Sequence, residues 1–185
     1  MRALSAARRH PLLLCLALQA LLLLPRLDLL PVWGDEFHTL ETIAKPTDRL
    51  LEDLSHEYHP PAYFLLARAW NVLPLPGDDI VRLRLLSVLL LLVATTLVWR
   101  FWVAQLAERT RWWFLALWAA SPFLTLYGRM ARSYTLQLVL SLVAIHFATA
   151  LFADPARRRY WLGCAVSLAA LFYVHYLPAM GLLLA

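Results

Sequence analysis

Two adjacent carboxylates, Asp35 and Glu36, stand in the stretch WGDEFH, directly after the first long apolar run of the sequence. The chain has only 12 acidic residues in 185, so a pair at this place is uncommon. A carboxylate next to an apolar run is suited to act as a general base at a membrane surface, where it takes the proton from a hydroxyl nucleophile. The alternative is a structural role, in which Asp35 caps the first turn of a helix.

Arginines form the second group of residues that are suited to chemistry. Arg129 and Arg132 lie in YGRMARSY, and Arg82 and Arg84 lie in VRLRLL. A guanidinium group binds phosphate through two parallel N–H donors, so these residues are candidates for holding an anion. Snorkelling, or pairing with nearby acids, explains the same charges without a ligand. Charge alone leaves both interpretations open.

Histidines and cysteines give weak metal signals. The motif HEYH at 56–59 is one residue shorter than the helical zinc motif, and proline follows it. The alternative is a metal site in which His38, His56 and His59 come together in space. The two cysteines, Cys15 and Cys164, are isolated within apolar segments. We therefore predict no metal site and no cofactor, and a divalent cation held by Glu36 is left open.

The composition is typical of a polytopic membrane protein, because 62% of the residues are hydrophobic, 16% are charged and the mean hydropathy is +0.62. A membrane helix needs about 20 apolar residues. Five segments meet this need, and we predict an all-α membrane protein with five transmembrane helices at 11–32, 84–104, 112–127, 133–153 and 160–185. A cleaved signal peptide is the alternative for the first of them.

Two of these segments have further features. The third contains Ser121-Pro122, which predicts a kink or a thin crossing. The fifth is apolar to the last residue of the sequence. Natural membrane proteins rarely stop inside an apolar run, so we expect the natural protein to be longer.

Arginine placement predicts the orientation. Clusters of arginine lie in the N-terminal segment 1–10 and in the connections after the second and fourth predicted spans. Positive charge favours the cytoplasmic side, so we expect the N-terminus inside and the loop 33–83 outside. The net charge of +5 reflects this topology, and we expect no nucleic-acid partner.

The loop 33–83 contains nine of the twelve acidic residues. Its sequence predicts two short helices, 36–44 and 48–57, with Asp35 and Thr47 as N-caps. A third helix of about a dozen residues follows Pro60-Pro61, which suit a helix start. It is too short to span, so we expect it to lie along the outer leaflet with Tyr63 and Trp70 at headgroup depth.

Taken in order, five stretches resemble the N-terminal part of GT-C glycosyltransferases: WGDEFH, HPPAYFLLARAW, RLRLLSVLL, SPFLTLYGRMARSYTLQLVLSL and YVHYLPAMGLLLA. The likeness is to the bacterial branch related to protein O-mannosyltransferases and the lipid A aminoarabinose transferase. It extends over nearly the whole chain from residue 11. Each motif is weak alone, and their order makes the resemblance more specific.

The resemblance implies a role for particular residues. The acid of the first outer loop is the catalytic carboxylate of such enzymes, which places this role on Asp35 with Glu36 beside it. Substrate-binding residues are implied at the positions that match the remaining motifs, namely His59, Arg84, Arg132, Tyr134 and His175.

The resemblance also implies the reaction and its place. Such an enzyme moves a sugar from a polyprenyl-phosphate carrier to a lipid, glycan or protein acceptor on the periplasmic side of the bacterial inner membrane. A single displacement by the acceptor inverts the anomeric configuration. The alternatives from the residues alone are a non-catalytic membrane protein, whose outer charges pair with each other, and a transporter fragment, whose ionisable residues line a path.

Overall fold

Every regular element that the computed structural model describes, in residues 6–56 and 59–184, is a helix, in agreement with the predicted all-α class. The α-helices and the single 3-10 helix are, in order, α1 (Ala6–Leu23), α2 (Gly34–Ala44), α3 (Thr47–His56), α4 (Ala62–Asn71), α5 (Asp79–Phe101), η1 (Val103–Gln105), α6 (Glu108–Ala119), α7 (Pro122–Gly128), α8 (Tyr134–Ala153), α9 (Arg158–Phe172) and α10 (Tyr176–Leu184).

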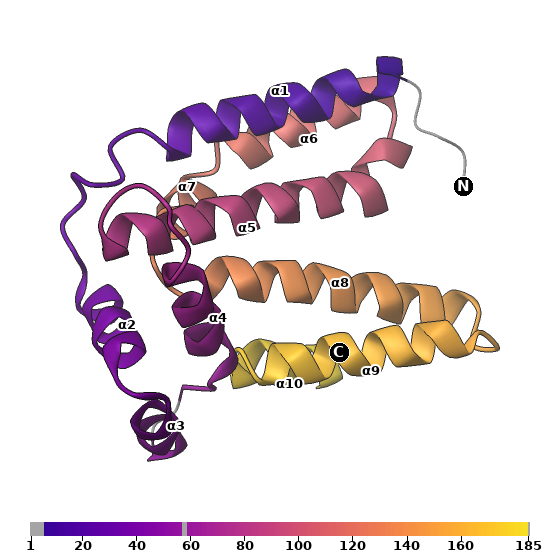
Figure 1. Cartoon of the computed structure of the whole chain (residues 1–185). Coiled ribbons are helices and arrows are strands. Elements are labelled where there is room, and N and C mark those ends of the chain that lie inside the picture. Colours follow the sequence, from indigo (N-terminus) through magenta and orange to yellow (C-terminus); the bar gives the residue numbers. More distant parts are fainter. Residues whose placement is uncertain (1–5, 57–58, 185) are drawn as a thin grey trace.

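The longer helices form a bundle with their axes roughly aligned (Figure 1). Helix α1 packs against α5 and α6, α5 packs against α8, and α8 packs against α9. Helices α2, α3 and α4 gather at one end of this bundle, and we call them the polar cap. The connection between α8 and α9 and the start of α6 lie at the opposite end (Figure 1).

Two helical segments among the described residues are long and apolar enough to cross a membrane. They are Asp79–Gln105, with a mean hydropathy of 2.1, and Tyr134–Ala153, with a mean hydropathy of 2.0. The first begins where the Asp78 carboxylate accepts a hydrogen bond of 3.0 Å from the backbone N–H of Val81. These helices correspond to the predicted spans 84–104 and 133–153.

The other three predicted spans are shorter in the structure, because proline interrupts each of them. Helix α1 ends just before Pro25, and Pro122 begins α7 after a break from α6. Pro178 has no N–H to continue α9, and the chain reverses into α10, which packs back on α8 and α9. The structure therefore does not show 11–32, 112–127 and 160–185 as single long helices, and the break before Pro122 agrees with the kink predicted at Ser121-Pro122.

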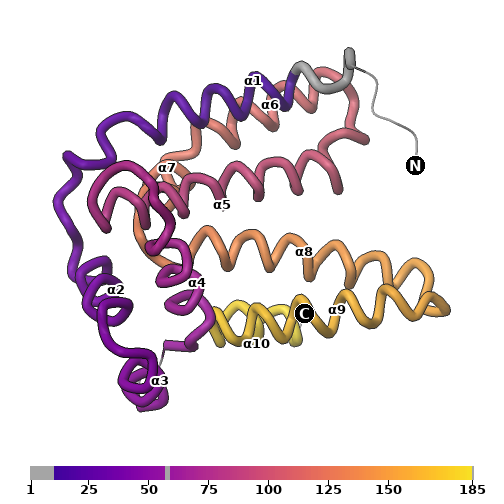
Figure 2. Tube along the Cα trace, viewed as in Figure 1, coloured from indigo at the N-terminus to yellow at the C-terminus, as the bar shows by residue number. Residues whose placement is uncertain are grey.

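Helices α2 and α3 form where the two loop helices were predicted, but Trp33 is the N-cap of α2 and Asp35 lies inside its first turn, so the prediction of Asp35 as N-cap was wrong. Helix α4 begins after Pro60-Pro61 as predicted, but its side chains Tyr63, Phe64 and Ala67 belong to a hydrophobic core shared with α3 and α5. Tyr63 is only 2% exposed, so its side chain faces this core and not the lipid headgroups. The trace in Figure 2 shows α4 within the polar cap, and α4 contacts both α2 and α5.

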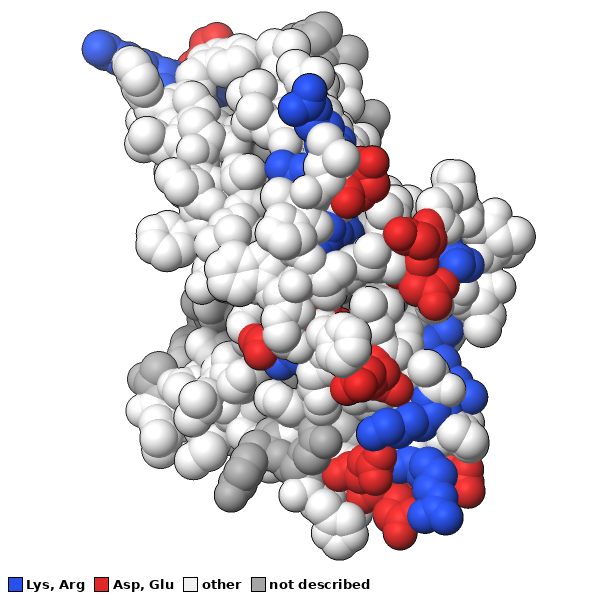
Figure 3. Space-filling model, turned by 90° about the vertical axis from the view of Figure 1, so that its left-hand side faces the viewer, with Lys and Arg blue, Asp and Glu red and all other residues white. Residues whose placement is uncertain are grey.

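Charged side chains are concentrated on the face that carries the polar cap (Figure 3). Several are paired there. Lys45 Nζ lies 2.7 Å from Asp53 Oδ2, and Arg49 Nη1 lies 2.9 Å from Glu52 Oε2. This end of the bundle therefore carries the acidic residues of the loop 33–83 together with their basic partners.

Candidate functional site

Glu36 and Arg84 form a buried ion pair at the junction of the polar cap and the bundle. Arg84 Nη2 donates to Glu36 Oε2 at 2.6 Å, and Arg84 Nε donates to Glu36 Oε1 at 2.9 Å. The Arg84 side chain is 1% exposed, and the Glu36 side chain is 0% exposed. Arg84 Nη1 also donates to the carbonyl oxygens of Leu27 and Leu30. The two-pronged geometry and the extra partners suit a charge pair removed from water.

The same carboxylate holds two backbone segments. Glu36 Oε1 accepts from the N–H of Ala131 at 2.8 Å, and Glu36 Oε2 accepts from the N–H of Trp33 at 3.2 Å. Ala131 lies in the link between α7 and α8, directly before Arg132. Glu36 therefore fixes the start of α2 against the segment that carries Arg132.

These contacts determine the ionisation of Glu36. Burial alone would raise the pKa of its carboxyl group, but the hydrogen bonds from Arg84, Ala131 and Trp33 and the charge of Arg84 outweigh burial and lower the pKa. Glu36 is therefore ionised at neutral pH.

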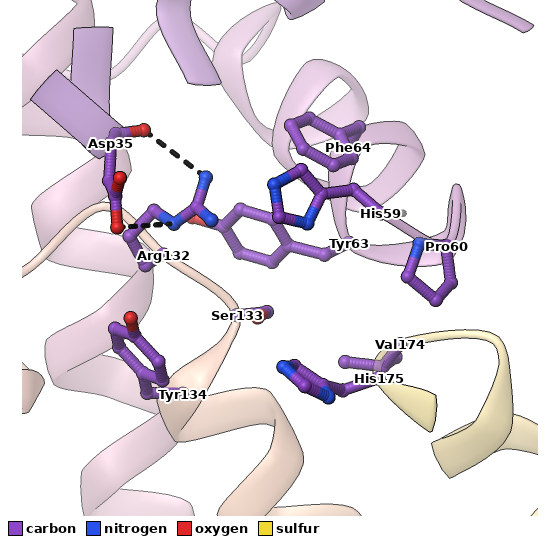
Figure 4. Close-up of a pocket in the computed structure, with 10 residues that line it drawn as sticks. All are labelled: Asp35, His59, Pro60, Tyr63, Phe64, Arg132, Ser133, Tyr134, Val174 and His175. Carbon is purple, nitrogen blue, oxygen red and sulfur yellow. Dashed lines mark hydrogen bonds and ion pairs between the residues drawn. The ribbon is translucent and has the colours of Figure 1, made fainter. Parts of the chain in front are cut away.

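A cavity of about 220 Å³ lies beside this junction (Figure 4). It collects residues from α2, the start of α4, the start of α8 and the turn before α10. The lining residues are Asp35, His59, Pro60, Tyr63, Phe64, Arg132, Ser133, Tyr134, Val174 and His175. Five of the seven predicted site residues are among them, although they are spread over 140 positions of sequence, from 35 to 175.

Asp35 and Arg132 form the charged side of this cavity. Arg132 Nε lies 3.9 Å from Asp35 Oδ2, and Arg132 Nη1 donates to the carbonyl oxygen of Asp35 at 3.2 Å. The Asp35 side chain is 62% exposed, whereas the Arg132 side chain is 10% exposed. Asp35 thus keeps a solvent-accessible carboxylate beside an arginine, which is the arrangement that a general base or a simple surface ion pair requires.

His175 lies on the opposite side of the cavity, in the turn that the Pro178 break creates. Its Nδ1 accepts the backbone N–H of Leu177 at 3.3 Å, so a neutral imidazole carries its proton on Nε2. The N–H of Ala62 at the start of α4 donates to the carbonyl oxygen of Tyr173 at 3.1 Å. This bond connects α4 to the turn and brings His175 toward the cavity.

His59 and Tyr134 complete the predicted group. The His59 ring lies 5.4 Å from the ring of His38 and 6.2 Å from that of Phe64, measured between centroids. The Tyr134 ring contacts the ring of Tyr127 at 4.7 Å, edge to face. Figure 4 shows Tyr134 and His175 coming from different elements toward the same space.

The two remaining predicted site residues, Glu36 and Arg84, do not line this cavity. They lie at the base of a second, largely apolar cavity of about 530 Å³, which Leu30, Trp33, Pro122, Leu126 and Met130 line together with Arg129. Because the buried pair is almost completely covered, apolar side chains form most of the surface of this cavity. Asp35 and Arg132 line the first cavity, whereas Glu36 and Met130, which are close to them in the chain, line the second.

The other arginines near the polar cap have partners within the chain. Arg82 Nη2 lies 2.6 Å from Asp79 Oδ1, and Arg129 Nη2 donates to the carbonyl oxygen of Pro25 at 2.7 Å. Together with Arg84, these contacts fit the interpretation that outer positive charges pair with nearby acids and carbonyls. Arg132 differs because its distance to a carboxylate, that of Asp35, is 3.9 Å, which is longer than the carboxylate distances of Arg82 and Arg84.

Sequence reasoning missed Thr39, Tyr63 and Ser133 as neighbours of the site. Thr39 lies one helical turn after Asp35, and Arg132 Nη1 approaches its hydroxyl at 3.4 Å. The spacing of four residues after Asp35 was a usable signal for Thr39. The sequence gave no comparable signal for Tyr63, whose burial depends on how α4 packs.

No group of three or more His, Cys, Asp or Glu side chains within the described residues is arranged to hold a metal ion. The prediction about HEYH falls partly on residues 57 and 58, which lie outside the described residues. His56 and His59 flank that gap.

Comparison of the chain with protein-family models, with curated proteins and with solved structures finds no match in any of the three. The candidate site therefore stands on the arrangement of its own residues.

Proposed function

We propose that this chain is the N-terminal part of a membrane glycosyltransferase that moves a sugar from a polyprenyl-phosphate carrier to an acceptor hydroxyl. The observation that carries the proposal is the cavity in which Asp35, Arg132 and His175 meet, together with His59 and Tyr134. Residues from three dispersed motifs thereby share one small space: an acid that can act as a base, and an arginine and a histidine that can donate to a phosphate.

In the proposed reaction, Asp35 takes the proton from the acceptor hydroxyl as its oxygen attacks the anomeric carbon. The bond between that carbon and the phosphate oxygen breaks, and its electron pair leaves with the carrier phosphate. A single displacement inverts the anomeric configuration. The exposed carboxylate of Asp35 suits this task because an acceptor reaches it without displacing a buried partner.

Arg132 stabilises the negative charge on the departing phosphate, and the Nε2–H of His175 is a second donor in the same cavity. His59 and Tyr134 contact the substrate from the remaining walls. Phosphate is a good leaving group without protonation, so this scheme requires no second carboxylic acid.

Glu36 and Arg84 take a positioning role in this proposal, in place of the direct substrate contacts that the resemblance implies. Each is saturated by the other and by backbone groups. The apolar second cavity is the place that we assign to the isoprenoid tail, because its lining matches a hydrocarbon chain. In the membrane, α5 and α8 would span the bilayer and the polar cap would face the periplasm.

The test is the substitution Asp35→Asn, assayed in membranes that contain the protein, a polyprenyl-phosphate sugar and natural acceptors. A panel of donors covers mannose, aminoarabinose and other sugars, and the readout is release of polyprenyl phosphate. We expect Asp35→Asn to lower the rate by about a hundredfold to ten-thousandfold. The folded level in the membrane should not change, because the carboxylate is exposed.

The matched control is Asp48→Asn, which alters an exposed aspartate in the first turn of α3, away from the cavity. It should retain the wild-type rate. A full rate in Asp35→Asn would exclude Asp35 as the base. An equal loss of folded protein and rate would instead favour the non-catalytic interpretation, in which Asp35 and Arg132 form a structural pair.

A further inference from the structure

Tyr63 has an unusual place among the residues that line the first cavity. Its side chain extends from α4 across the back of the cavity toward Arg132 (Figure 4). The residue is 2% exposed, yet its hydroxyl has no hydrogen-bond partner among the described residues. A buried hydroxyl without a partner lowers stability, so such a group in a cavity wall indicates a site for a ligand atom.

Arg132 presents a second unsatisfied group in the same wall. The residue is 8% exposed, and its hydrogen bonds to Asp35 and Thr39 both use Nη1. Its Nε has no hydrogen-bond partner among the described residues, and Asp35 Oδ2 is 3.9 Å away. A buried guanidinium with an unused donor favours an anionic ligand, because a buried donor without a hydrogen bond is costly and an anion accepts from a guanidinium most strongly.

We infer that Tyr63 is a ligand-binding residue whose hydroxyl, together with the guanidinium of Arg132, binds the oxygen atoms of a phosphate monoester in this cavity. The inference rests on the proposed function in its choice of phosphate as the ligand. It adds a residue that neither the sequence motifs nor the carboxylate chemistry singled out.

The chemistry of the two groups is complementary to phosphate. Burial raises the pKa of the Tyr63 hydroxyl, so this group stays protonated and acts as a donor. Arg132 supplies the positive charge and a planar set of N–H donors. A neutral sugar hydroxyl would satisfy Tyr63 but would bring no negative charge to the guanidinium, whose contact with the Asp35 carboxylate is long, at 3.9 Å.

The test compares Tyr63→Phe with wild type in the full chain, purified in detergent micelles. Titration calorimetry measures binding of geranyl phosphate, with inorganic phosphate and geraniol as separate probes. Because Tyr63→Phe removes a single hydrogen bond to a charged group, we expect geranyl phosphate to bind about 10- to 100-fold more weakly. Geraniol, which has no phosphate, should bind neither protein measurably.

Tyr173→Phe is the matched control, because Tyr173 is 59% exposed and does not line the cavity. It should bind like wild type. The melting temperature of ligand-free Tyr63→Phe should equal or exceed that of wild type, since the lost hydroxyl had no partner. A lower melting temperature with unchanged affinity would show a structural hydroxyl and overturn the inference.

The probes also distinguish the source of the phosphate. If wild type binds geranyl phosphate but not inorganic phosphate, the ligand is a lipid phosphate. If it binds inorganic phosphate equally well, the site takes free phosphate. Either result upholds the inference if Tyr63→Phe weakens that binding. Absence of binding to wild type overturns it. If phosphate binding depends on Tyr63 but no donor supports sugar transfer, the inference stands and the proposed function falls. If wild type transfers sugar but its phosphate binding does not depend on Tyr63, the proposed function stands and the inference falls.

Discussion

Asp35 and Glu36 are adjacent in the chain but lie in opposite environments. Successive residues of a helix point about 100° apart, so one side chain of the pair faces the cavity while the next faces the interior. Asp35 is 62% exposed and Glu36 is 0% exposed. Their chemistry is separated accordingly: Asp35 is accessible to a substrate, and Glu36 holds Arg84 and two backbone N–H groups.

We expect Glu36→Gln to destabilise the folded chain by about 3–5 kcal/mol, because it leaves the guanidinium of Arg84 buried without a counter-charge. Glu52→Gln is the matched control, since Glu52 pairs with Arg49 at the surface, and it should change stability by less than about 1 kcal/mol. Thermal unfolding in micelles measures both. Equal stability of the two variants would contradict the structural role of the buried pair.

The same pair predicts how stability responds to acid. The pKa of Glu36 is lowered in the folded chain, so its contribution is fully present above its ordinary value of 4.5 and is lost as the pH falls toward the lowered pKa. The melting temperature of wild type should therefore fall as the pH is lowered below 4.5. Glu36→Gln should show a smaller fall over the same range.

At the scale of elements, the contact between α8 and α9 depends on a glycine. A Cβ added at Gly163 would lie 2.5 Å from the ring of Phe147 on α8, whereas a Cβ at Gly181 would meet nothing within 4 Å. Glycine therefore permits the close approach of these two helices. Because α9 leads directly into the turn that carries His175, their packing also helps to form one wall of the cavity.

We expect Gly163→Ala to lower stability by about 1–3 kcal/mol through overpacking against Phe147. Gly181→Ala is the matched control; it should be neutral or stabilising, because alanine favours a helix more than glycine does. Thermal unfolding of both variants in micelles is the measurement. A neutral result at Gly163 would mean that the Phe147 ring moves aside without cost.

At the scale of the whole molecule, the polar cap and the arginine-rich connections lie at opposite ends of the bundle (Figure 1). If α5 and α8 span the membrane, these ends face opposite sides. The first cavity lies at the end with the polar cap, so the proposed reaction is confined to one side of the membrane.

This arrangement predicts labelling by an impermeant maleimide in intact cells. In a background with Cys15 and Cys164 replaced by alanine, Ser55→Cys on α3 should react, because that position is exposed in the polar cap. Ala156→Cys, which is exposed between α8 and α9, should react only after the cells are opened. The reverse pattern would place the polar cap in the cytoplasm.

The sequence by itself determined the local and compositional properties of this protein. Apolar runs with few charges predicted helices, and two of them, around α5 and α8, are long enough to span. The short helices α2 and α3 were predicted from local start signals, although α2 begins one residue before Asp35, at Gly34. The breaks at Pro25 and Pro178 carried such a signal too, but we gave the apolar runs more weight than the proline within them.

Only the tertiary structure decided which of the chemical residues meet. Arg84 and Arg132 look alike in sequence, yet one is saturated by Glu36 and the other lines a cavity with an unused donor. The burial of Tyr63 likewise follows from packing of α4 against α3 and α5. Contacts between residues far apart in the chain depend on how helices pack. The local sequence patterns that predict helices do not determine which helix faces come together.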